Sequence, residues 1–246
     1  DHRIEKGDTI REPKLLEEGE LILYDRVIAN PPFSLKNWGR EEAESDEYGR
    51  FRFGLPPKTA GDYSFIQHMV ATLNHEGKAG VVMAHGVLFR GGAEGTIRKG
   101  FIEEDLIEAV IGLPSNLFYG TGIPACILIL NRNKSEERKN KIFFLDGSHD
   151  YQEGKSQNTL RDQDIEKIGA AYDKYEEVEK YSCLVGIEEI RENDYNLSIA
   201  RYINTKEEEE QIDVATVLVQ LRKLEQERNE IETVMYRYLK ELGYSD

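Results

Sequence analysis

In this chain a largely apolar run, Leu21-Ile22-Leu23-Tyr24-Asp25-Arg26-Val27-Ile28-Ala29, is followed by Asn30-Pro31-Pro32-Phe33. The aliphatic and β-branched residues of the run predict a strand buried inside an α/β sheet. Because proline has no backbone N–H and pushes the preceding residue into extended geometry, the strand must stop at Asn30. Asn30 and Phe33 are therefore expected beyond the carboxyl end of a strand, where open α/β sheets bind ligands.

The residues after this strand suit a planar amine. The side-chain oxygen of Asn30 and the carbonyl of Pro31 can each accept one hydrogen of an NH2 group, which leaves the nitrogen lone pair directed at an electrophile. Phe33 can stack on the ring that carries the amine. Two neutral acceptors that are oriented in advance stabilise the charge that develops on nitrogen during methyl transfer. The alternative is a rigid polar turn without chemistry.

The segment Asp25 to Phe33 resembles the catalytic motif of DNA methyltransferases that make N6-methyladenine. With Ser34 and Phe118-Tyr119-Gly120-Thr121-Gly122-Ile123-Pro124, it is similar to the methylation subunit of type I restriction-modification systems. The resemblance runs from about Gly7 to the last helix. It implies an α/β fold: a partial, Rossmann-like sheet of an S-adenosylmethionine-dependent methyltransferase with helices on its faces, plus a long C-terminal helix. Similar motifs serve protein glutamine methylation, so a protein or RNA amine methyltransferase is an alternative.

The resemblance also implies roles for the residues of the turn. Asn30 and Pro31 would hold the amino group of an adenine in DNA, Pro32 would set the turn, and Phe33 would stack on the base. The adenine must first leave the duplex, because its amine is otherwise paired. In the family the loop matching Leu113 to Pro124 helps to wall the base pocket, which assigns Phe118 and Tyr119 to substrate binding. The alternative is an ordinary loop with both rings packed into the core.

S-adenosylmethionine would be the methyl donor. The family segment that matches Gly7-Asp8-Thr9 places an acidic side chain on the amino group of the cofactor, although Asp8 could equally cap a turn. We assign Asn30, Tyr63 and Phe65 to the same cofactor site.

The Gly-rich loop that cradles the cofactor in the family does not occur in this sequence. Gly91-Gly92-Ala93-Glu94-Gly95 follows the wrong strand and predicts a surface turn. The first residue is Asp1 rather than Met. We therefore expect a fragment that lacks the N-terminal part and the cofactor loop, and that is inactive alone.

Charge, hydropathy and cysteine content limit the partners and the compartment that we expect for this chain. A net charge of -15 counts against a simple nucleic-acid binder, because duplex affinity comes largely from Lys and Arg. We expect another subunit to supply much of the grip on DNA, and the family's partners are a specificity subunit and a motor-nuclease subunit. No apolar run approaches the ~20 residues that span a bilayer, and two distant cysteines, Cys126 and Cys183, indicate a reducing cytoplasm. The histidines form no pattern typical of a metal site.

Helical and strand patterns alternate along the rest of the first part. This alternation predicts a mainly parallel sheet with helices on its faces. The resemblance to the methyltransferase fold implies that the strands at 107–111 and 125–130 form an antiparallel pair at one edge. Residues 41–53 lack steady periodicity and predict a mobile loop over the site. The predicted elements are a helix at 62–73 capped by Asp62, a helix at 95–104, and strands at 81–84, 107–111, 125–130 and 142–146.

The last part of the sequence predicts a long helix from Ile212 to Leu242. Apolar positions alternate steps of three and four, as in a heptad seam with one polar position; they are Val214, Val217, Leu221, Leu224, Arg228, Ile231, Met235, Tyr238 and Leu242. We predict a methyltransferase catalytic domain at 1–204 and a subunit-interaction segment at 205–246. The seam would contact the specificity subunit or a second copy of the chain. A non-catalytic assembly module is the alternative.

Overall fold

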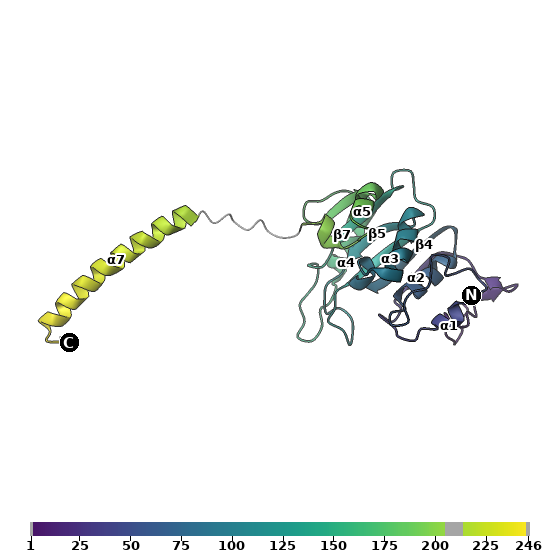
Figure 1. The fold of residues 1–246 in the computed structure, drawn as a ribbon, viewed down its shortest axis with the longest axis horizontal. Helices are drawn as coiled ribbons and strands as arrows, with labels where there is room; N and C mark the ends of the chain where they lie inside the picture. Colours follow the sequence, from purple (N-terminus) through teal and green to yellow (C-terminus); the bar gives the residue numbers. More distant parts are fainter. Residues whose placement is uncertain (1, 205–213, 245–246) are drawn as a thin grey trace. The chain divides into compact units, whose positions relative to one another are not determined.

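The computed structural model describes residues 2–204 and 214–244. The chain divides into two compact units, Asp1–Thr205 and Lys206–Asp246. The first unit is a sheet with helices packed against it, and the second contains one long helix, α7 (Val214–Glu241) (Figure 1). The predicted α/β class with a long C-terminal helix is confirmed, whereas the expected helix start at Ile212 lies outside the described residues.

The main sheet of the first unit has the strand order β3-β4-β6-β5-β7-β8. Its strands are β3 (Tyr24–Ala29), β4 (Leu73–Ala84), β5 (Ile107–Gly112), β6 (Ala125–Asn131), β7 (Lys141–Asp146) and β8 (Ser182–Gly186). β3, β4, β5 and β7 run in one direction, and β6 and β8 run in the other. The sheet is therefore mixed. The expected antiparallel pair, β5 and β6, lies inside the sheet rather than at its edge because β7 and β8 extend it.

Strand β3 lies at an edge of this sheet rather than inside it. Within residues 2–204 its ladder partner is β4 alone. Half of its side chains are exposed, and Ile28 is 90% exposed. The prediction of a buried strand is thus wrong for the described residues. β-branched residues favour a pleated surface, but they do not state how many neighbours a strand has.

Strand β4 begins at Leu73 rather than at Val81. Its register with β3 shifts between the pairs Tyr24↔Leu73 and Arg26↔Lys78, so the chain bulges between these two points. Gly77 and Gly80, which precede the predicted start, belong to the strand, and Gly80 pairs with β3 on one side and β6 on the other. A separate hairpin precedes β3 and consists of β1 (Leu16–Glu17) and β2 (Glu20–Leu21).

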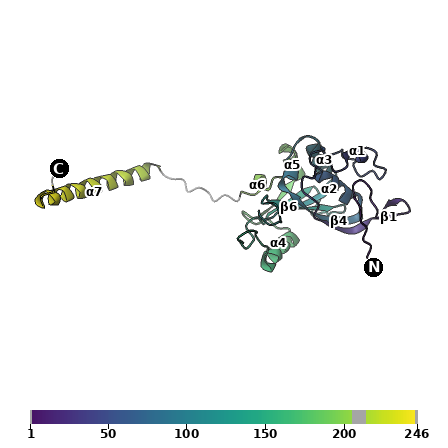
Figure 2. The same cartoon turned by 90° about the horizontal axis from the view of Figure 1, so that it is seen from below.

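Helices cover the sheet on both faces, with α4 on the face opposite α2, α3 and α5 (Figure 2). Alternate residues of the central strands serve the two layers: Val110 and Phe144 pack on the first face, and Ile111 and Phe143 pack on the second. The helices of the first unit are α1 (Arg40–Ala43), α2 (Asp62–Ala71), α3 (Gly92–Glu103), α4 (Asp162–Lys174), α5 (Ile187–Glu192) and α6 (Ile199–Tyr202), with a 3-10 turn η1 (His85–Leu88).

Two helices begin differently from the sequence-based prediction. α2 forms as expected, but its N-cap is Gly61, and Asp62 is the first helical residue. α3 begins at Gly92, so the predicted surface turn at 91–95 is the first turn of this helix. Gly92 has a φ of 64°, a conformation that glycine adopts without strain.

Residues 41–53 form part of the first unit and are anchored in it by Arg50. Arg50 is 4% exposed and pairs with Asp46 at 2.7 Å. Its guanidinium also donates to the carbonyls of Thr9 (2.9 Å) and Ile10 (2.7 Å). Arg50 therefore joins this segment to the N-terminal segment, next to a small core that contains Trp38.

No helix within 2–204 or 214–244 combines the length and the apolar character needed to cross a membrane. The same residues contain no group of three or more His, Cys, Asp or Glu side chains that could hold a metal ion. Cys126 is buried and Cys183 is half-buried, and both are free thiols. Burial raises the pKa of both thiols.

His68 couples folding of the first unit to pH. Its side chain lies on α2 and is 8% exposed. Nε2 lies 3.0 Å from Thr9 Oγ1, and Nδ1 lies 3.3 Å from Arg50 Nη1. Burial and the Arg50 charge lower the pKa of His68 from 6.5 to about 4. Between these values the unfolded chain binds a proton that the folded chain does not bind, so stability falls as the pH falls.

We predict that this loss depends on His68. Between pH 6.5 and 4.5 the unfolding free energy of the parent should fall relative to that of His68→Gln by on the order of 2 kcal/mol. Urea unfolding of both proteins at several pH values measures the difference directly, and other titrating groups cancel. A difference that stays constant over this range would contradict the assigned pKa.

Candidate functional site

The chain leaves β3 at Ala29 and turns through Asn30-Pro31-Pro32-Phe33. Pro31 is buried, Asn30 and Pro32 are exposed, and Phe33 is half-buried. Ser34 follows with a φ of 51°, which is uncommon for a residue with a Cβ atom. The structure thus places the Asn30 side chain at the exposed carboxyl end of a strand, where the sequence predicts it.

An aromatic contact brings a second predicted segment to this turn. The ring centroids of Phe33 and Phe118 are 6.0 Å apart with an interplanar angle of 85°, an edge-to-face geometry that aromatic pairs prefer. Phe118 belongs to the connection between β5 and β6 (residues 113–124). Tyr119 in the same connection is 93% exposed, so the alternative with both rings in the core does not hold for it.

A polar loop supports the connection that carries Phe118. Asn158 Nδ2 donates to the Ser115 carbonyl at 2.9 Å, and the Asn158 N–H donates to the Asn116 carbonyl at 2.8 Å. Gln157 Nε2 donates to the Leu117 carbonyl at 2.6 Å. The amide side chains hold the loop backbone up to the residue before Phe118. No role was predicted for residues 147–204, because isolated Asn and Gln residues carry no local signal of a distant partner.

The segment after the turn is fastened to the start of α2. The Ser34 N–H donates to Asp62 Oδ1 at 2.7 Å, and the Gly61 N–H donates to the Leu35 carbonyl at 2.9 Å. Trp38 Nε1 donates to the Pro57 carbonyl at 2.9 Å. Asp62 was expected to cap its own helix. Instead its buried carboxylate binds the backbone that leaves the turn.

The turn can hold a planar amine without an ionised base. Asn30 offers an amide oxygen that is exposed at the end of the strand, and Pro31 adds a backbone carbonyl; both act as neutral hydrogen-bond acceptors. The Phe33 ring, fixed edge-to-face by Phe118, supplies an apolar surface next to them. Acceptors held in advance stabilise charge as it develops on a reacting group.

The other predicted cofactor residues are engaged in structural contacts. Asp8 Oδ1 accepts from the N–H groups of Ile10 (3.0 Å) and Arg11 (3.1 Å), and Oδ2 accepts from Arg11 Nη1 at 2.6 Å. Burial raises the pKa of Asp8, but the bonds from Arg11 and Ile10 outweigh it, and the pKa is lowered. Asp8 makes the hydrogen bonds of a turn cap in this structure, and its contact with the cofactor stays a prediction.

Tyr63 and Phe65 lie in the protein interior. Tyr63 is 1% exposed, and its hydroxyl donates to the Val87 carbonyl at 2.8 Å. Phe65 is 8% exposed and packs in the small core with Trp38. Most side chains of α2 are buried, so Tyr63 and Phe65 can both lie in the interior although they are only two residues apart.

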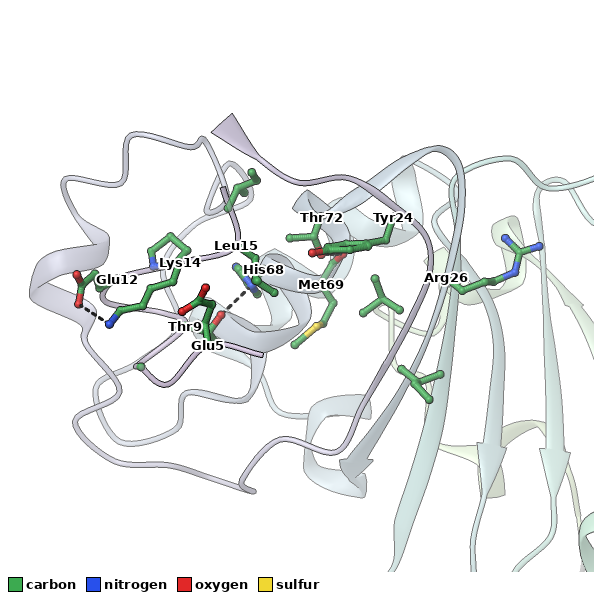
Figure 3. A pocket seen from close by; sticks show the side chains of 15 residues that line it. Glu5, Thr9, Glu12, Lys14, Leu15, Tyr24, Arg26, His68, Met69 and Thr72 are labelled. Carbon is green, nitrogen blue, oxygen red and sulfur yellow. Dashed lines mark hydrogen bonds and ion pairs between the residues drawn. The ribbon is translucent and has the colours of Figure 1, made fainter. Parts of the chain in front are cut away.

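A cavity of about 440 Å³ lies beside β3. Its walls come from the N-terminal segment, from Tyr24, Arg26, Val27 and Ile28 of β3, from His68 and Met69 of α2, and from Thr72, which follows α2 (Figure 3). Residues 30–33 do not belong to its lining. The cavity therefore borders the edge strand rather than the turn.

Comparison with known proteins shows what the chain is similar to. The N-6 DNA methylase family matches residues 1–211. The type I restriction enzyme MjaVIII methylase subunit of Methanocaldococcus jannaschii is 41% identical over 252 residues, which cover 99% of this chain and 43% of the relative. The HindI methylase subunit of Haemophilus influenzae is 34% identical over 251 residues, with 97% and 55% covered. The chain thus spans about half the length of these relatives.

A solved structure supports the same likeness. The methyltransferase subunit of a type I restriction-modification system from Streptococcus thermophilus superimposes with a TM-score of 0.73 at 40% identity. The match covers 80% of this chain and 41% of that chain. The EcoKI M protein, at 21% identity and a TM-score of 0.58, shares the fold.

Gly61 allows the close approach that fastens the turn, and its replacement tests this. A Cβ atom at Gly61 would lie 2.6 Å from Trp38 Cβ and Cγ. We predict that Gly61→Ala destabilises the protein by about 1–3 kcal/mol through overpacking, measured as a lower urea midpoint. Gly169→Ala in α4, where a Cβ meets nothing within 4 Å, is the control and should stabilise by about 0.5–1 kcal/mol. Equal effects of the two changes would contradict the packing described.

Proposed function

Because the chain belongs to the N-6 DNA methylase family, we propose that it forms part of the methylation subunit of a type I restriction-modification system. That subunit would transfer a methyl group from S-adenosylmethionine to N6 of an adenine in DNA. The contact between Phe33 and Phe118 is the observation that carries the proposal. It brings the two sequence segments with the family resemblance together at the end of β3.

Each residue of the turn has a role in this proposal. Asn30 Oδ1 and the Pro31 carbonyl accept the two hydrogens of the adenine amine, so its lone pair points away from them. Pro32 keeps the chain from continuing the ladder of β3. Phe33 stacks on the extruded base, and Phe118 and Tyr119 line the opening through which the base enters. Extrusion costs a few kcal/mol of unstacking, which contacts with these rings help to offset.

The cofactor needs contacts that the described residues do not supply. Asp8 is occupied by Arg11 and by backbone N–H groups, and Tyr63 and Phe65 are buried. S-adenosylmethionine would supply an electrophilic methyl group when bound. We propose that its cradle comes mainly from the parts of the longer relatives that this chain does not span, and that Asn30 is the residue that this chain places next to it.

The partners follow from the same proposal. With a net charge of -15, this chain is unsuited to hold a duplex alone, because affinity for DNA depends on neutralising phosphates. A specificity subunit would read and grip the DNA, and a motor-nuclease subunit would complete the assembly. We place the assembled enzyme in the cytoplasm, where its DNA substrate lies.

The second unit supports a subunit contact. The seam side chains from Leu221 to Leu242 are exposed, among them Leu221 (50%), Leu224 (62%) and Ile231 (70%). Burying one such side chain is worth about 1.5–3 kcal/mol, so a partner helix would bind this seam favourably. We propose that the specificity subunit provides the partner, and that a second copy of this chain does so in its absence.

Replacement of Asn30 tests the proposed chemistry. In the full-length subunit, assembled with its partners, Asn30→Ala should lower methyl transfer to adenine by about 10²-fold, because one preorganised acceptor is lost. Transfer of a radiolabelled methyl group measures the rate. Asn133→Ala, an exposed asparagine after β6, is the matched control and should leave the rate unchanged. Normal activity of a folded Asn30→Ala protein would refute the role of Asn30.

A double replacement tests the seam of α7. Leu221→Asp with Leu224→Asp should abolish association with the specificity subunit, or with a second copy, while the first unit stays folded. Light scattering gives the molar mass, and circular dichroism reports folding. Gln226→Asp with Asn229→Asp adds the same charge at positions outside the seam and should leave association intact. Association that survives the Leu221 and Leu224 change would locate the interface elsewhere.

A further inference from the structure

Asp62 is a charged residue without contact to solvent. It is 0% exposed, and a buried carboxylate is costly unless its oxygens are paired. Oδ1 accepts the Ser34 N–H at 2.7 Å, and Oδ2 accepts from Arg90 Nη2. One oxygen therefore holds the backbone just beyond Phe33, and the other is held by a cation.

Arg90 joins this carboxylate to a second one. Its Nε donates to Glu94 Oε2 at 2.7 Å, and its Nη2 donates to Glu94 Oε1 at 3.0 Å. Glu94 is 3% exposed. A guanidinium is planar and offers its donors in fixed directions. The pair of bonds to Glu94 therefore sets the plane in which Arg90 meets Asp62.

The main chain around Arg90 is fixed as well. Its carbonyl accepts from Arg98 Nη1 at 2.8 Å, and its N–H donates to the Gly86 carbonyl at 3.0 Å. Arg98 is 3% exposed and also donates to the carbonyls of Val87 and Tyr195. A Cβ atom at Gly86 would lie 2.4 Å from Arg90 Nη1, so the guanidinium packs directly on the backbone of η1. The cation thus has little freedom to move.

We propose that Asp62, Arg90 and Glu94 form a positioning network for the Asn30–Phe33 turn. The inference rests on the proposed function and assigns residues that position its site without touching substrate. Ser34 is held in a left-handed conformation, which a residue with a Cβ atom leaves unless its surroundings oppose this. The bond to Asp62 provides that opposition, and Arg90 holds Asp62. Loss of Arg90 would let the turn relax, so its acceptors would no longer be aligned on the amine.

The experiment uses the full-length subunit in its assembled complex. Arg90→Ala should lower kcat for methyl transfer by about 10–100-fold, since small misplacements of reacting groups cost this much. KM for S-adenosylmethionine should stay within about threefold. Hydrogen–deuterium exchange of the peptide that contains Ser34 should become faster. Arg90→Lys keeps the positive charge but loses the planar guanidinium with its fixed donor directions. Its kcat should lie between those of Arg90→Ala and the parent. If Arg90→Ala does not fold, Arg90→Lys provides the test.

Arg191 is the matched control. It also bridges two carboxylates, with bonds of 2.6 Å to Glu103 and 2.6 Å to Glu188. Among the described residues, these partners make no hydrogen bond to residues 30–34. Arg191→Ala should therefore leave kcat and the exchange of Ser34 unchanged, although it also removes two ion pairs, whose carboxylates are more exposed than those of Asp62 and Glu94.

The outcomes separate this inference from the function on which it rests. An active parent with unchanged kcat and unchanged Ser34 exchange in Arg90→Ala would overturn the network. A raised KM at constant kcat would also overturn it, because that result indicates a role of Arg90 in binding. Faster exchange throughout the first unit would overturn it as well, because that result indicates a role in general stability. A parent complex that transfers no methyl group would remove the proposed function and the catalytic part of the inference. In that case, hydrogen–deuterium exchange of the peptide that contains Ser34 would show whether the network holds the turn.

Discussion

Two consecutive proline nitrogens carry no hydrogen, and much of the first unit follows from this constraint. Pro31 and Pro32 cannot extend the ladder between β3 and β4, so the chain must leave the sheet at Asn30. The departing segment then finds its partners in residues 57–62: Ser34 bonds to Asp62, and the Trp38 indole bonds to Pro57. The start of α2 is thereby placed beside the end of β3, and the Asn30–Phe33 turn lies at the boundary of the folded core.

Polar side chains are paired and buried at one end of the sheet and exposed at the other. At the amino end of β5, the buried carboxylate of Glu108 receives Lys78 Nζ at 2.9 Å, Arg138 Nη1 at 2.8 Å, and further bonds from Asn131 and Tyr172. Burial would raise its pKa, but the bonds from Asn131, Tyr172 and Lys78 bring the pKa to about 2. At that end of the sheet the carboxylate of Glu108 is therefore buried and surrounded by hydrogen-bond donors. At the carboxyl end, Asn30 is exposed and its amide acceptor is available to a ligand.

Local sequence signals predicted those parts of the fold that depend on local physics. The end of β3, the helix after Gly61 and the buried runs of β5 and β6 follow from proline geometry and hydrophobic periodicity. Apart from the start of α3 at Gly92, which is a local error, the main failures concern distant partners. Asp62 has the residue type of a helix cap, yet a backbone N–H 28 residues earlier takes its carboxylate. The edge position of β3 depends on strand order, and the support of Phe118 by Asn158 depends on loops that meet only in the folded unit.

Among the described residues, β3 is an edge strand whose outer backbone groups have no ladder partner. An edge strand presents unpaired backbone groups to which another chain can add, and charged side chains on it discourage such pairing. Asp25 and Arg26 are both exposed on β3, and Asp25 is held by Asn74 Nδ2 at 2.5 Å. A foreign strand that approached this edge would have to desolvate both charges. Ile28, at the end next to the functional turn, carries no such penalty. Among the described residues, Ile28 is therefore the part of this edge that is least protected against the addition of another strand.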